Sequence, residues 1–134
     1  MTGLILKLAP GERVLVNGAI IENGDRRSRI SILTPKANIL RLRDAIHPES
    51  VDSPVSRICY ICQLVLTGDA VEGEGRRQIL YGIEKLSQVF CDPDSSNLLA
   101  FASNAIIEGN YYAAFRSLRS LIARESRLMA IGAP

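Results

Sequence analysis

Apolar and polar residues alternate through most of the first 44 residues, and this period of two constrains the fold more than any other feature. Successive side chains of a β-strand point to opposite faces of a sheet, so the pattern predicts short strands with one aliphatic face. The residues expected on that face are Leu4, Leu6, Leu8, Val14, Val16, Ile30, Ile32, Leu40 and Leu42.

Turn residues separate the alternating segments. Asn17-Gly18 and Asn23-Gly24 are pairs that accept the positive φ angles of a type I′ hairpin turn, and Pro35 begins a further turn. The arrangement predicts an antiparallel meander of four or five short strands. A bulge at Asn17-Gly18 within one longer strand is an alternative interpretation.

Cations recur on the face opposite the aliphatic one. They are Lys7, Arg13, Arg29, Arg41 and Arg43, with Arg41 and Arg43 expected on one exposed side of the last strand. Residues 1–46 hold eight Lys or Arg against four Asp or Glu, and since the whole chain carries +2, the remainder is net acidic. This asymmetry fits an anionic partner for the sheet, but it also fits a solvated face that keeps strand edges from associating.

A period of 3.6 replaces the period of two after Pro54. Ser53 is a suitable N-cap, and helices are expected from Pro54 to Gly68, over 76–90, from about Pro93 to Gly109, and over 111–130. Short loops between amphipathic helices predict a bundle. The expected organisation is a basic β region at 1–47, a linker at 48–53 and a helical region at 54–130, packed as one α+β unit.

No catalytic constellation is recognisable. Cys59 and Cys62 form a C-x-x-C motif, but they lie on an apolar helical stripe, and neither Cys91 nor His47 is at ligand spacing. We therefore expect structural thiols, no metal, no cofactor and no enzyme. The chain shows neither a signal peptide nor an apolar run long enough for a membrane helix, so we expect a cytoplasmic protein.

Arginines also gather on the last helix. Arg116, Arg119, Arg124 and Arg127 fall on one arc of about 140° at helical spacing. They fit the solvent-exposed polar face of an amphipathic helix, or a surface that binds an acidic partner or another anion. All seven Tyr and Phe residues lie at or after Tyr60, so RNA binding by the sheet would rely on arginine planes, backbone groups and phosphate contacts.

Three motifs resemble the FlbT family of bacterial flagellar regulators: GERVLVNGA at 11–19, ISILTP at 30–35 and YYAAFRSLRSL at 111–121. The resemblance implies a post-transcriptional regulator that binds the 5′ untranslated region of flagellin mRNA and represses translation or promotes decay, although some members promote expression. It also implies a companion regulator, FlaF, as a partner. The alternative is a protein–protein adaptor in flagellar assembly or regulation that affects RNA only indirectly.

The strand region alone contains Leu4-Ile5-Leu6, Gly11-Glu12, Pro35-Lys36 and Arg43-Asp44-Ala45-Ile46. These segments are similar to landmarks of the carbon storage regulator family, whose members are small β dimers that bind RNA through basic residues of the first and last strands. Arg43 matches the basic residue of the last strand. Leu8 stands where that family has an arginine, while Lys7 is one residue away and on the opposite face. The RNA-binding role that the resemblance implies therefore transfers to Arg43 better than to Lys7. A homo-oligomer is also compatible with the sequence.

Overall fold

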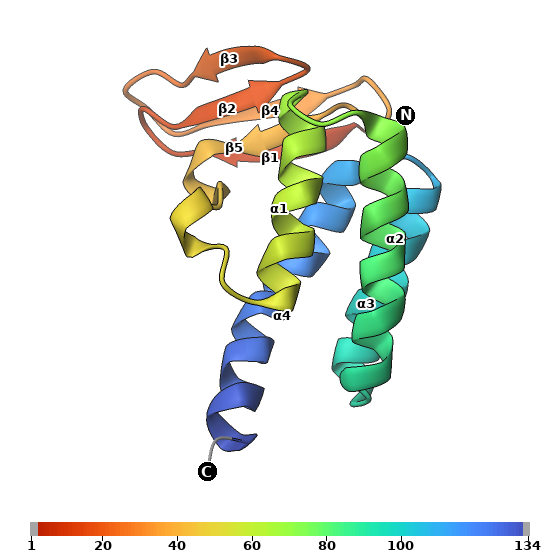
Figure 1. Cartoon of the computed structure of the whole chain (residues 1–134). Helices are drawn as coiled ribbons and strands as arrows, with labels where there is room; N and C mark the ends of the chain where they lie inside the picture. The colour runs from red at the N-terminus through yellow and green to blue at the C-terminus, as the bar shows by residue number, and fades with distance from the viewer. Residues whose placement is uncertain (1–2, 133–134) are drawn as a thin grey trace.

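The computed structural model describes residues 3–132, with side chains up to Leu128. Its strands are β1 (Leu4–Leu8), β2 (Arg13–Val16), β3 (Ala19–Glu22), β4 (Ser28–Ile32) and β5 (Ile39–Arg41), and its α-helices are α1 (Pro54–Thr67), α2 (Glu72–Val89), α3 (Pro93–Ile107) and α4 (Tyr111–Gly132). Two short 3₁₀ helices, η1 (Leu42–Asp44) and η2 (Pro48–Ser50), connect β5 to α1. The predicted α+β class is confirmed, and Figure 1 shows the helices extending from one side of the strand region.

The strands form two antiparallel ladders rather than one meander. β1 pairs with β4, and β2 lies between β3 and β5. Asn17 and Gly18 have φ values of 47° and 86°, so the predicted tight turn between β2 and β3 is confirmed.

The predicted second hairpin at Asn23-Gly24 is wrong, because neither residue has a positive φ. Asn23 instead uses its side chain to hold a crossover. Its Nδ2 donates to the Ala9 and Arg26 carbonyls, both at 2.8 Å, and its Oδ1 accepts from Ser28 Oγ at 2.7 Å. These bonds send the chain across to β1, which is why β4 does not pair with β3.

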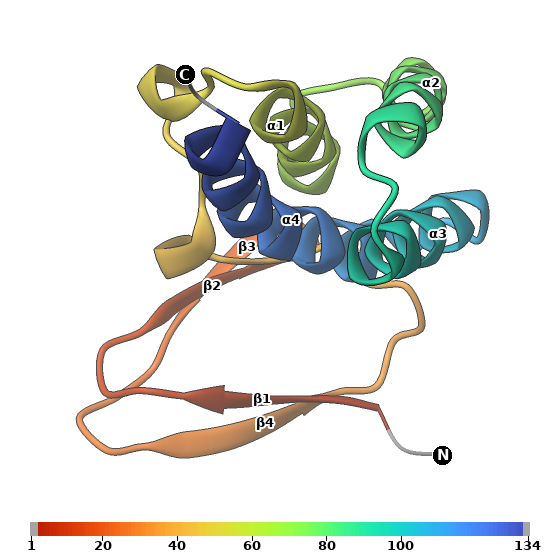
Figure 2. The same cartoon turned by 90° about the horizontal axis from the view of Figure 1, so that it is seen from below.

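The alternation in β1 and β4 produces the expected two faces. Leu6 opposes Ile30 on the inner face, while Lys7 opposes Arg29 on the outer face. The inner residues of both ladders belong to the same hydrophobic cluster as the helices, and Figure 2 shows the helices on one side and the β1–β4 ladder on the other. In the last strand the expectation for Leu42 is wrong, because β5 ends at Arg41 and Leu42 is exposed in η1.

Local signals explain where the helices begin. Ser53 accepts from the Ser56 N–H and Pro54 follows it, so α1 begins where predicted. Asp92 caps α3 by accepting from the Ser95 N–H at 3.0 Å. Among the described residues no helix is both long and apolar enough to cross a membrane.

The second helix begins at Glu72, four residues before the predicted start. Glu72 and Glu74 lie in its first turn, where a negative charge interacts favourably with the helix dipole. A Cβ on Gly75 would lie 2.6 Å from Val65 Cγ2, so glycine at this position permits α1 and α2 to approach closely. The glycines that indicated a loop are therefore part of the helix and its packing.

Candidate functional site

A buried ion pair joins the two β ladders. Arg41, on β5, donates to the carboxylate of Glu12 at 2.6 and 2.8 Å and to the Lys7 carbonyl of β1 at 2.5 Å. The Ala9 N–H also donates to Glu12, at 3.0 Å. These contacts, with Arg41 foremost, lower the pKa of Glu12 from 4.5 to about 2 in spite of its burial.

This pairing corrects the expected placement of two cations. The Arg41 side chain is only 12% exposed, so it is not available on an open strand face. Arg43 lies in η1 rather than on a strand, and its side chain is 57% exposed with Nε 3.8 Å from Glu12. The two arginines therefore do not share one exposed side, because the chain turns into a 3₁₀ helix immediately after Arg41.

Four cations line a groove of about 580 Å³ at one end of the β1–β4 ladder. They are Lys7 of β1, Arg27 directly before β4, Arg29 of β4 and Arg43 of η1, and we call this set the cationic groove. Lys7 and Arg29 are direct cross-strand partners, and neither has a carboxylate within 4 Å in the described part of the chain. The sequence analysis did not include Arg27 among the candidate cations, although the Arg26-Arg27 pair directly before a strand was a usable signal.

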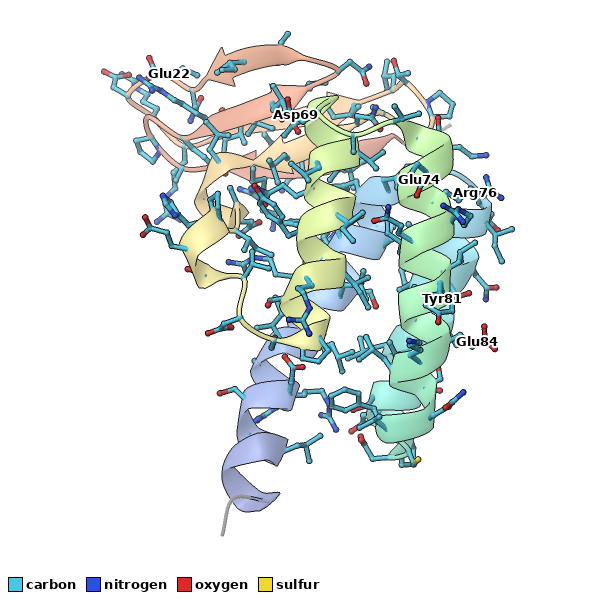
Figure 3. The ribbon with its side chains drawn as sticks, viewed as in Figure 1. Glu22, Asp69, Glu74, Arg76, Tyr81 and Glu84 are labelled. Atoms are coloured by element: carbon cyan, nitrogen blue, oxygen red, sulfur yellow. The ribbon has the colours of Figure 1, made fainter. Side chains whose placement is uncertain are left out.

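The fifth predicted cation lies outside the groove. Arg13, on β2, donates to Glu22 of β3 at 2.8 Å across the ladder, and both side chains are well exposed. Figure 3 shows Glu22 in the strand region, on the opposite side of the view from Tyr81 and Glu84 of α2. A neutralised cross-strand pair of this kind stabilises the hairpin modestly and is less available to an anion.

The arginines of α4 do not form one continuous free strip. Arg119 donates to the Asp44 carbonyl at 2.8 Å, and Arg124 donates to Asp92 at 2.5 Å and to Ser95 at 3.1 Å. These two residues hold η1 and the start of α3 against α4. The first and last of the four, Arg116 and Arg127, are exposed, and Arg116 Cζ lies 5.7 Å from the centre of the Tyr112 ring.

The thiols are placed for packing rather than chemistry. Cys59 and Cys62 are fully buried in α1, and burial raises the pKa of Cys59 to about 12. Cys91 is exposed at the end of α2, and the exposed His47 accepts weakly from the Glu49 N–H at 3.4 Å. Within residues 3–132, no group of three His, Cys, Asp or Glu side chains could hold a metal ion.

The family model described as "Flagellar protein FlbT" matches residues 4–129. The chain is 30% identical over 127 residues to a probable flagellum biosynthesis repressor protein FlbT of Rhodopseudomonas palustris, covering 95% of this chain and 98% of that one. It is 28% identical over 122 residues to the flagellum biosynthesis repressor protein FlbT of Caulobacter vibrioides, covering 91% and 86%. No solved structure matches significantly.

Proposed function

The chain belongs to the FlbT family of flagellar proteins, and from this premise we propose that it represses flagellum biosynthesis by binding the 5′ untranslated region of flagellin mRNA through the cationic groove. The family consists of regulators rather than enzymes. The names of the relatives support the repressor role. Support for RNA as the ligand comes from the resemblance and from the charge distribution of the strand region.

One observation carries the RNA proposal: Lys7 and Arg29 lie directly opposite each other on the outer face of the β1–β4 ladder. Like charges in this position destabilise a ladder by a few tenths of a kcal/mol to about 1 kcal/mol. Arg27 and Arg43 add two more positive charges beside them. A bound phosphate would offset this repulsion, so an otherwise unfavourable arrangement becomes favourable in the complex.

The chemistry of the groove suits the backbone of RNA better than its bases. Arginine and lysine contact phosphates directly, and each contact releases counterions that had condensed on the nucleic acid. The described strand residues include no aromatic side chain on which a base could stack. The cationic groove would therefore position an RNA strand, while recognition of particular bases requires other groups.

Fluorescence anisotropy with purified full chain and labelled flagellin leader RNA, over a series of salt concentrations, tests the proposal. Lys7→Ala with Arg29→Ala should weaken binding about tenfold or more and reduce the magnitude of the salt slope by about two, one for each lost phosphate contact. The same variant should unfold no more readily than the wild type, because the substitutions remove a repulsion.

Arg57→Ala with Arg77→Ala is the matched control. It removes the same formal charge from exposed positions on α1 and α2, outside the cationic groove. The control should bind RNA nearly as the wild type does. Equal losses of RNA affinity in the two double variants would mean that binding depends only on net charge. Absence of RNA binding by the wild type would refute direct RNA recognition.

A protein-binding role is the second candidate, and the exposed apolar side chains of α3 favour it. Phe101 is 56% exposed and lines a groove of about 680 Å³ between α3 and α4, together with Leu98 and Arg116. An exposed aromatic beside a cation suits a partner with apolar and acidic side chains. We propose the companion regulator FlaF as the first partner to test, by capture with and without ribonuclease treatment, using Phe101→Asp as the disrupting variant.

A further inference from the structure

A cavity of about 270 Å³ lies between the end of the β1–β4 ladder and the first turns of α4, and it shares Ala113 and Arg116 with the groove between α3 and α4. Leu4 and Ile32, which are direct partners in the ladder, contribute its aliphatic wall. Tyr112 and Arg116 line it from α4, and Lys36 lines it from the loop between β4 and β5. We call this the β1–α4 cavity.

The charged side chains in the described lining of this cavity are two cations without acidic partners. Neither Lys36 nor Arg116 has a carboxylate within 4 Å in the part of the chain that the structure describes. Arg116 lies against the Tyr112 ring, so its guanidinium is held by a planar surface. Lys36 has a φ of 55°, a strained value for a residue with a side chain, and such strain is concentrated at functional sites.

We infer that the β1–α4 cavity receives one unstacked base of the bound RNA, with Arg116 as its stacking plane and Lys36 beside its phosphate. Single-stranded RNA is recognised by splaying bases out onto aromatic rings or arginine planes between apolar walls. The cavity is smaller than the roughly 300–1,000 Å³ typical of pockets for drug-sized ligands, which suits a single ring system. A peptide helix needs a longer groove, and the lining here offers no carboxylate to pair with a basic peptide.

The position of the cavity relative to the cationic groove fits a single RNA segment. The Lys7–Arg29 pair and the Leu4–Ile32 pair are three residues apart in the same ladder and therefore on its opposite faces. At about 3.4 Å per residue, they are roughly 10 Å apart along the strands, so a short stretch of RNA that crosses the edge of the ladder would reach both. The inference rests on the proposed function, and it supplies the base contact that the cationic groove lacks.

Arg116→Lys is the decisive variant, because it keeps the charge and removes the planar guanidinium. In the anisotropy assay it should lower affinity for the flagellin leader about tenfold, as expected for one lost stacked base, while leaving the salt slope unchanged. Ala113→Leu, which fills the cavity from a helical position without changing charge, should have the same effect. Arg127→Lys, on the same face of α4 but outside the cavity, is the control and should bind normally.

Leader RNAs that each lack one base identify the contact. At one position, the missing base should lower the affinity of the wild type for the leader about tenfold. Arg116→Lys should bind that RNA no more weakly than it binds the intact leader. Wild-type affinity of both Arg116→Lys and Ala113→Leu would overturn the base site while leaving the cationic groove intact. If those variants keep RNA affinity but lose capture of a protein partner, the base site is refuted and the surface that the cavity shares with the groove between α3 and α4 serves a protein instead. A wild-type chain that binds no RNA would refute the proposed function itself.

Discussion

The ion pair between Glu12 and Arg41 should be a main source of stability in the strand region. Arg41→Met keeps much of the volume of the side chain and removes its charge, which leaves the Glu12 carboxylate with only 5% of its side chain exposed. Removing one partner of a fully buried pair costs about 3–5 kcal/mol. In this variant Glu12 keeps its hydrogen bond from the Ala9 N–H and has Arg43 Nε at 3.8 Å. We therefore expect the free energy of unfolding to fall by about 2–3 kcal/mol.

The lowered pKa of Glu12 gives an independent upper limit on the stability that its contacts with Arg41 contribute. A fall from 4.5 to about 2 corresponds to at most about 3 kcal/mol, since a tenfold change in an equilibrium constant is worth about 1.4 kcal/mol. A lowered pKa stabilises the folded state above pH 4.5, and this contribution is lost as the pH falls towards 2. Asp92, whose pKa is lowered to about 2 chiefly by the Ser95 N–H, adds to the same acid sensitivity.

Urea unfolding followed by circular dichroism measures both effects. At pH 7 we expect Arg41→Met and Glu12→Gln each to be destabilised, and the double variant to lose less than the sum of the two. Glu12→Gln should also lose less stability than the wild type between pH 5 and pH 3. The reasoning is refuted if Arg41→Met unfolds at the wild-type urea concentration, or if the coupling between the two sites is below about 0.5 kcal/mol.

Three further predictions concern the packing. A thiol reagent at neutral pH should modify only Cys91 in the folded protein and all three cysteines in denaturant, and rapid modification of a second thiol in the folded state would contradict the burial of Cys59 and Cys62. Gly82→Ala should destabilise by about 1–3 kcal/mol, since its Cβ would lie 2.4 Å from Ile58 Cδ1, whereas Gly73→Ala, in the same helix with open space around it, should be neutral or stabilising in thermal unfolding. Residues 1–50 alone should not form a folded monomer, because the buried residues of the strands share one cluster with those of the helices, and dispersed amide signals from a monomeric fragment would argue against this.

The sequence determined the local structure because the responsible interactions are local. The alternation of Leu4, Leu6 and Leu8 requires a strand with one buried face, and Asn17-Gly18 requires a tight turn, wherever these segments lie in the molecule. Ser53 and Pro54 similarly decide the start of α1 through bonds that reach only three residues along the chain.

Tertiary structure alone decided the pairing of the strands and the availability of the cations. Alternation specifies a face but not a partner, so the crossover held by Asn23 could not be read from the pattern. Arg41 and Arg29 have the same residue type and both follow the alternating pattern, yet one is buried against Glu12 and the other faces solvent beside Lys7. The difference arises from contacts between residues up to 34 positions apart, because a charge is available to a ligand only where the fold brings no opposite charge to it.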